Sequence, residues 1–320
     1  MMYINPESCK PKTARLIITT DCNFRCQMCT FWKKEPLDAS LETIKYWIKE
    51  LADFGIKEID LGGGEPLLRK DLPEIIKEVK SYGIKCGLTT NGWLLSQIPF
   101  PPLDYIDISI DGAKPETHDK IRGMKGSWER AIRAAEIAKE HCPTRLNFVL
   151  QAANYTELVD FCHLAKKLGV SAGLIPVSLK LVAQPRITND LSKYDIPLLK
   201  RILAEAFKTG VIEHNQELFR IFLRKLEKGP FPQKCLAPFR CLLIFTDSDV
   251  YPCGSFDVPV GNLSIGKSFK DVYQNYKNVR KETWSGSHKF CDMCVYSDLS
   301  TRATLLSSVF PFFQKIIKRK

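Results

Sequence analysis

The chain has 320 residues, of which 44% are hydrophobic and 26% are charged, a composition typical of globular proteins. This length accommodates one large domain, or a barrel followed by a smaller module. No stretch approaches the roughly 20 apolar residues of a membrane-spanning helix, and the N-terminal residues do not resemble a signal peptide. The composition therefore excludes secreted and membrane-spanning classes and predicts a cytoplasmic protein.

The formal net charge is +11, which suits binding to nucleic acid, to an anionic membrane or to an acidic protein. The lysines and arginines are scattered along amphipathic segments, and the sequence shows no basic stripe with interleaved aromatic residues. We therefore do not expect nucleic-acid binding, whereas an acidic electron-donor protein suits this surface.

The hydrophobic pattern predicts strands in regular alternation with helices. Ser40 is the expected N-cap of the first helix, which is expected to stop at Gly55. The predicted strands cover residues 15–20, 57–61, 84–92, 105–112, 144–151 and 170–177, and later helices cover residues 71–82, 126–140, 155–169 and about 195–208. About six such units predict a parallel sheet with right-handed crossovers, and hence an α/β fold built on a partial (β/α)6, TIM-like barrel.

The character of the sequence changes after residue 229, where a proline-rich stretch precedes two short strand-like runs and a small helix at residues 268–282. We therefore expect a second, smaller module after the barrel. The predicted organisation is an N-terminal extension (1–14), the barrel (15–214), a linker helix (215–230), a cysteine-bearing module (231–300) and a C-terminal tail (301–320).

Twelve cysteines in a reducing compartment favour metal binding or catalysis over a disulfide framework. Seven of them form two groups, Cys22, Cys26 and Cys29 near the start, and Cys235, Cys253, Cys291 and Cys294 near the end. Most of the other five are expected to be small buried residues.

The first group has the spacing C-x3-C-x2-C directly after the first predicted strand. Three thiolates on one loop leave a metal coordination position open, which a four-ligand structural site does not. A zinc site that borrows a distant fourth ligand is the alternative. The GGGE segment after the second strand, residues 62–65, combines glycines that let a backbone approach closely with a carboxylate that can receive an ammonium group.

In order and spacing, these motifs resemble those of the radical SAM enzymes. The resemblance implies that Cys22, Cys26 and Cys29 bind a [4Fe–4S] cluster whose fourth iron binds S-adenosylmethionine (SAM). Reductive cleavage of SAM then yields a 5′-deoxyadenosyl radical that abstracts a hydrogen atom from substrate. It also implies that Gly63, Gly64 and Glu65 bind the amino group of SAM, and that Phe31 shelters the cluster or the adenine.

Later segments match the family less specifically. The resemblance places Asn91 at the segment that ends the third strand, and Ser109 and Asp111 near the ribose or carboxylate of SAM. Asn91 and Asp111 could equally be turn-forming residues. His118, in HDKIRG, is expected to be structural.

The second group resembles the C-terminal SPASM/twitch module of many radical SAM enzymes. This implies an auxiliary [4Fe–4S] cluster on Cys235, Cys253, Cys291 and Cys294, in the shorter twitch form. A zinc ribbon is the alternative. One position departs from the family, since Ser248 replaces the expected glycine. Cys241 stays open as a core thiol, a substitute ligand or a catalytic hydrogen-atom donor.

The predicted function is a radical SAM oxidoreductase acting on a small-molecule or lipid-like substrate, with a flavodoxin- or ferredoxin-type electron donor. A peptide or protein maturase is the alternative within the family, although a fused peptide-recognition domain is not expected before Cys22. A non-enzymatic zinc-binding adaptor is the alternative outside it. The tail 301–320 combines apolar and basic residues, which suits either packing on the barrel or peripheral contact with a membrane.

Overall fold

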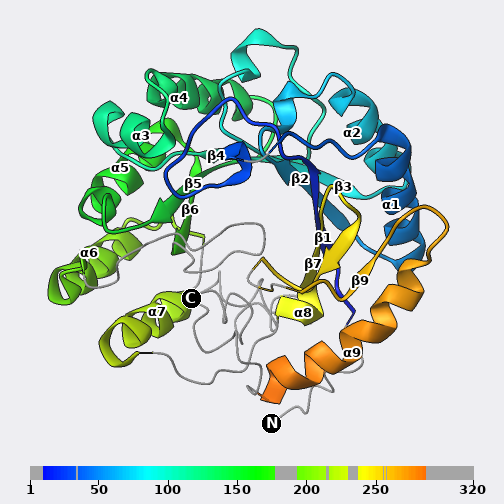
Figure 1. Cartoon of the computed structure of the whole chain (residues 1–320). Coiled ribbons are helices and arrows are strands. Elements are labelled where there is room, and N and C mark those ends of the chain that lie inside the picture. The colour runs from blue at the N-terminus through cyan, green and yellow to red at the C-terminus, as the bar shows by residue number, and fades with distance from the viewer. Residues whose placement is uncertain are drawn as a thin grey trace, which may run out of the picture.

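The computed structural model describes residues 10–33, 35–176, 193–213, 216–229, 237–254, 256 and 258–285. It shows a curved sheet with helices along its outer side (Figure 1). The strands are β1 (Thr13–Thr19), β2 (Glu58–Gly63), β3 (Lys85–Thr90), β4 (Tyr105–Ser109), β5 (Thr144–Leu150), β6 (Ser171–Pro176), β7 (Cys241–Ile244), β8 (Asp249–Tyr251) and β9 (Gly261–Asn262).

The α-helices are α1 (Leu41–Phe54), α2 (Leu72–Ser81), α3 (Pro115–Arg122), α4 (Ser127–Ala138), α5 (Leu158–Leu168), α6 (Ile196–Lys208), α7 (Gln216–Lys228), α8 (Ala237–Arg240) and α9 (Phe269–Ser285). Short 3-10 turns are η2 (Phe31–Lys33), η3 (Pro66–Leu68), η4 (Leu95–Gln97) and η5 (Tyr155–Glu157). The predicted caps of α1 are confirmed, because the Ser40 side chain accepts a hydrogen bond from Thr43 N and Gly55 takes the left-handed conformation with φ 99°.

The sheet order is β6-β5-β4-β3-β2-β1-β7-β8-β9, and β1 to β6 pair in parallel. The predicted partial (β/α)6 barrel is therefore confirmed. Because parallel strands end at one edge, the loops that follow β1, β2, β3 and β4 meet there.

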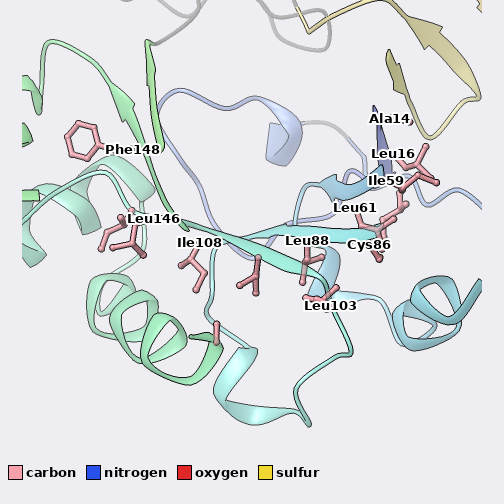
Figure 2. Packing of buried hydrophobic residues seen from close by; sticks show 14 of the residues in the cluster. Ala14, Leu16, Ile59, Leu61, Cys86, Leu88, Leu103, Ile108, Leu146 and Phe148 are labelled. Atoms are coloured by element: carbon pink, nitrogen blue, oxygen red, sulfur yellow. The ribbon is translucent and has the colours of Figure 1, made fainter. Parts of the chain in front are cut away.

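Alternate side chains of each strand form the core between the sheet and the outer helices. Leu16, Leu61 and Leu88 are fully buried, as are Trp47 of α1 and Ile76 of α2 in the same cluster. Figure 2 shows such residues from successive strands on the side that faces the helices. Burying each of these side chains stabilises the fold by about 1.5–3 kcal/mol.

The C-terminal part continues the barrel sheet, which the sequence did not indicate. β7 pairs in parallel with β1, and β8 and β9 follow antiparallel. The Trp47 indole of α1 donates to Leu263 O at 3.0 Å, and the Phe54 and Phe269 rings lie 4.8 Å apart. The sheet and helix α9 therefore connect the expected module directly to the start of the barrel (Figure 1).

Within the described ranges, no helix has both the length and the apolar character needed to cross a lipid bilayer. The predicted linker helix at 215–230 corresponds to α7. The tail 301–320, Cys235, Cys291 and Cys294 lie outside the described residues.

Candidate active site at the carboxyl ends of the strands

The cysteine loop, residues 20–30, connects β1 to η2 and carries Cys22, Cys26 and Cys29. Its backbone donates hydrogen bonds to the end of helix α3, from Arg25 N to Arg122 O at 3.3 Å and from Gln27 N to Ile121 O at 2.8 Å. The last carbonyls of a helix lack partners within the helix, so the loop satisfies them. Helix α3 therefore fixes the loop that carries the three thiols.

Two glycines attach the same loop to the end of β2. A Cβ atom on Gly63 would lie 2.2 Å from Thr19 O, and one on Gly64 would lie 2.0 Å from Asp21 O. Gly64 N donates to Thr19 O at 2.8 Å, and Glu65 N to Asp21 O at 2.7 Å. The sequence suggested that these glycines make room for a ligand; in the structure the chain's own backbone occupies that space. They are needed because the cysteine loop packs directly on them.

Glu65 is a fully buried carboxylate beside this loop. It accepts hydrogen bonds from the Thr90 hydroxyl at 2.6 Å, from Leu67 N at 3.1 Å and from Asn91 N at 2.7 Å. Burial raises the pKa of Glu65, while these hydrogen bonds act in the opposite direction. A carboxylate offers about four acceptor positions, so this one retains capacity for a further donor.

Asn91 connects Glu65 to the cysteine loop. Its side-chain amide donates to Asn23 Oδ1 at 2.8 Å, and its Oδ1 accepts from Trp93 N at 2.9 Å. Asn91 could be a turn-forming residue or a site residue, and the structure is compatible with both, since it shapes the turn after β3 and also contacts the cysteine loop.

Arg122, which was not predicted as a site residue, is a buried cation beside the cysteine loop. It is 8% exposed, its Nη2 lies 2.7 Å from Asp111 Oδ2, and its Nη1 donates to Cys26 Sγ at 3.9 Å. Its charge lowers the pKa of Cys26, Cys29 and Glu65 against the larger raising effect of burial. The segment HDKIRG, residues 118–123, contains this arginine, but its sequence does not show that the arginine side chain points into the site.

Asp111 forms an ion pair with Arg122, and His118 contacts the backbone of Asp111. Asp111 is fully buried; its Oδ1 accepts from Val149 N at 2.7 Å, and its Oδ2 forms the ion pair with Arg122. His118 Nδ1 accepts from Asp111 N at 3.0 Å, and burial lowers the pKa of His118 to about 3. His118 is therefore neutral, in line with the expected structural role.

The surroundings of the three thiols suit an iron–sulfur cluster. Burial and the neighbouring acidic groups raise the pKa of Cys22 to about 12, so a metal is needed to hold these sulfurs as thiolates. Phe24, Met28 and Ile121 form an apolar shell with Cys26 that limits solvent access. Among the described residues, no three Cys, His, Asp or Glu side chains are close enough to share one metal ion; a cubane instead binds each thiolate to a separate iron.

Several buried polar atoms near these strand ends have no hydrogen-bond partner within the described residues. They include Arg122 Nε, His118 Nε2 and Gln151 Nε2, together with Asp111 Oδ2, whose contact with Arg122 is an ion pair. Ser109 ends β4, and its side chain is only partly buried. Phe31 opens η2, and its backbone N–H lowers the pKa of Cys29. The buried Glu65 carboxylate therefore suits an ammonium group, and the uncommitted nitrogens, which are donors, suit an acceptor such as a carboxylate.

Of the second cysteine group, the structure describes Cys253, which follows β8 and is partly buried. Cys241 opens β7 opposite Thr13, at the far end of β1 from the cysteine loop, about 20 Å away for six residues of strand. The thiols of Cys241 and Cys253 both contribute to a raised pKa of Tyr276, mainly caused by burial. The structure thus does not bring Cys241 to the first cysteine group. Ser248 adopts φ 69°, the left-handed conformation that explains the glycine expected there.

The sequence profile described as "Radical SAM superfamily" matches residues 16–175, which is half of the chain. This chain belongs to the radical SAM superfamily. Enzymes of this superfamily use a [4Fe–4S] cluster and SAM, and the matched region contains the cysteine loop, Glu65 and Arg122.

Curated radical SAM relatives differ in how much of their length this chain spans. An "AdoMet-dependent heme synthase" from Methanosarcina barkeri is 27% identical over 89% of this chain and 89% of its own length. A "Probable GTP 3',8-cyclase" from Thermococcus kodakarensis is 32% identical over 58% of this chain, and one from Saccharolobus islandicus is 35% identical over 49%. The chain spans 62% and 54% of those two cyclases.

Solved radical SAM structures confirm the fold. SuiB from Streptococcus suis, solved with SAM bound, aligns with a TM-score of 0.64 at 17% identity, over 89% of this chain and 72% of SuiB. anSMEcpe with bound AdoMet and the Cp18Cys peptide aligns with a TM-score of 0.62 at 15% identity, over 97% of this chain and all of that chain. Identities this low support the shared architecture alone.

Proposed function

We propose that this chain is a SAM-cleaving oxidoreductase in which Cys22, Cys26 and Cys29 hold the [4Fe–4S] cluster. The observation that carries this proposal is one connected network: the cysteine loop, Asn91 and the buried Glu65 carboxylate lie together at the strand ends. When bound, the cluster and SAM supply one-electron cleavage of the sulfonium and a 5′-deoxyadenosyl radical for hydrogen-atom abstraction.

The residues of this chain bind and orient. Glu65 pairs with the amino group of SAM, because it is a buried carboxylate with remaining acceptor capacity and no ion-pair partner within 4.0 Å among the described residues. Arg122 offsets negative charge at Cys26, while Asp111 holds the guanidinium in place. The apolar shell around Phe24 and Ile121 keeps water from the cluster.

We propose that Cys253 binds an auxiliary [4Fe–4S] cluster together with Cys235, Cys291 and Cys294, and that Cys241 is a core thiol. The spacing of the four cysteines supports this ligand set. Cys241 is left out of it because its thiol donates a hydrogen bond to Ala237 O at 3.5 Å. Such a cluster would accept an electron from a substrate radical or support substrate binding.

We propose a small molecule as the substrate. The support is the relative from Methanosarcina barkeri, which aligns along 89% of both chains and is named a heme synthase, so its product is a small molecule. A peptide is the second candidate, favoured by the fold match to anSMEcpe with a bound peptide. A flavodoxin- or ferredoxin-type donor would supply the electron.

The test uses anaerobically reconstituted protein. We expect about eight irons per chain, as two cubanes require, and formation of 5′-deoxyadenosine from SAM with dithionite. Cys26→Ala should abolish that product, whereas Cys86→Ala, a fully buried cysteine in β3, should retain it. Two zinc ions per chain and no 5′-deoxyadenosine would instead indicate the zinc-binding adaptor.

A further inference from the structure

The inner face of the barrel strands is charged. Arg15 of β1, Asp60 of β2, Asp107 of β4 and Arg145 of β5 alternate with the apolar residues that pack on the outer helices. Closed TIM barrels fill this space with branched apolar side chains. Half-buried charges in place of such a core are typical of a binding site.

Asp60 and Thr89 hold the Arg15 guanidinium through Nε and Nη2, and its Nη1 group is left over. Its Nε donates to Asp60 Oδ2 at 2.5 Å, its Nη2 also pairs with Asp60, and Nη2 donates to the Thr89 hydroxyl at 3.0 Å. Within the described part of the chain, Nη1 makes no hydrogen bond or ion pair. The side chain is 44% exposed although it lies on the concave face. A carboxylate and a hydroxyl thus hold a guanidinium whose Nη1 donors remain available.

The opposite side of the interior is already neutralised. Arg145 Nη2 donates to Asp107 Oδ2 at 2.6 Å, and Nη1 donates to Glu213 Oε2 at 3.2 Å. Asn147, two residues further along β5, has a buried Oδ1 that accepts no hydrogen bond from the described residues. Among the described residues, the interior therefore offers cationic N–H donors at Arg15 Nη1 and an uncommitted acceptor at Asn147 Oδ1.

Glycines keep the space between these groups free of side chains. A Cβ atom on Gly62 of β2 would meet nothing closer than 3.9 Å, and the atoms at that distance belong to Arg15 and Ile17. A Cβ atom on Gly173 of β6 would lie 2.0 Å from Asn147 Oδ1. Larger residues at these two positions would occupy the interior or displace the amide.

We propose that Arg15 is the substrate-anchoring residue and binds an anionic group, a carboxylate or phosphate, of a polar small molecule inside the barrel. This rests on the proposed function, since it assigns the substrate class of that site. The two free N–H groups of Nη1 can donate to the oxygens of either group. The ion pair with Asp60, whose side chain is 13% exposed, orients the guanidinium while the Arg15 side chain itself stays 44% exposed.

The position of Arg15 sets the size of the ligand. Four residues of strand separate it from Thr19 at the end of β1, which is about 13 Å. The reactive C–H group therefore lies on the order of 10 Å from the anionic group. Such a ligand is a polar metabolite, and the charged interior does not suit a lipid chain.

The test measures the reaction of phenylglyoxal with individual arginines in the full-length, cluster-loaded protein with SAM, read by peptide mass spectrometry. The probes are glutarate, inorganic phosphate and neutral glutaramide at equal ionic strength. Arg133, on the surface of α4 with its side chain 65% exposed, is the internal control. No substitution is needed, so the fold is not perturbed.

We expect phenylglyoxal to label Arg15. For a Kd in the millimolar range, glutarate or phosphate at about four times that Kd should slow the labelling of Arg15 about fivefold. Arg133 labelling should be unchanged, as should Arg15 labelling with glutaramide. Protection by glutarate alone identifies a carboxylate ligand, and protection by phosphate alone a phosphate ligand. An Arg15 that is never labelled, or that no anion protects, overturns the proposal. Formation of 5′-deoxyadenosine is measured separately, so failure of the proposed function remains distinguishable.

Discussion

Replacing Glu65 by glutamine tests how this chain holds SAM. The fully buried carboxylate already accepts three protein hydrogen bonds, from Thr90, Leu67 and Asn91. Glutamine removes the charge that attracts the ammonium group and directs an NH2 group at protein N–H or O–H donors. A hydrogen bond to a charged group contributes about 1.5–3 kcal/mol, which corresponds to a SAM Kd raised about 10- to 150-fold.

Thr90→Val separates the two effects of that substitution. It removes the hydroxyl donor at 2.6 Å but leaves the carboxylate charged. We expect its SAM affinity to fall less than about fivefold, or roughly 1 kcal/mol, because the carboxylate keeps its charge and its donors Leu67 N and Asn91 N. Equilibrium dialysis of anaerobically reconstituted protein measures both constants. Equal affinities of Glu65→Gln and the original protein would refute the assignment of Glu65.

Affinity for SAM should also depend on pH through Glu65. Burial raises the pKa of this carboxyl above its usual value, so it takes up a proton at a higher pH than an exposed glutamate. Protonation removes the attraction for the ammonium group, and the SAM affinity should fall as the pH is lowered from about 7 toward the usual carboxyl range. Glu65→Gln should show a flatter profile; parallel profiles would contradict this.

Three further substitutions have defined outcomes. Gly64→Ala places a Cβ atom 2.0 Å from Asp21 O, so it should lower the iron content from about eight to about four per chain. Gly62→Ala, whose Cβ would meet nothing closer than 3.9 Å, should retain the full iron content. Arg122→Met should lower the midpoint potential of the SAM-binding cluster by at most ~170 mV, the effect of removing a unit charge near 4 Å. An electron paramagnetic resonance titration measures this potential, and Arg122→Lys should restore part of the lost potential. Cys253→Ala should reduce iron to about four per chain, while Cys241→Ala should keep about eight; equal iron contents of the two variants would refute the ligand assignment.

The alternating units of the barrel could be predicted because the signals are local. Ser40 caps the start of α1 with its side chain, and Gly55 ends the helix through its left-handed backbone. Each strand shows a run of apolar residues. Helix α3 was not predicted because its sequence, PETHDKIR, is mostly polar and contains few residues at apolar spacing.

The interior of the site depends on contacts between distant segments, and sequence did not provide them. The inward direction of Arg122 depends on Asp111 and on the cysteine loop that packs on the end of α3. The need for Gly64 arises from a carbonyl 43 residues away, at Asp21. Likewise, the pairing of β7 with β1 joins residues more than 220 positions apart, beyond any local pattern.

A cluster bound by the three thiolates of Cys22, Cys26 and Cys29 leaves one iron open for SAM. Electron paramagnetic resonance of the dithionite-reduced protein, with SAM carrying a nitrogen isotope label in its amino group, measures this directly. We expect SAM to change the cluster signal and the label to alter a nitrogen coupling, with both effects lost in Cys26→Ala. A signal that is identical with and without SAM would contradict it.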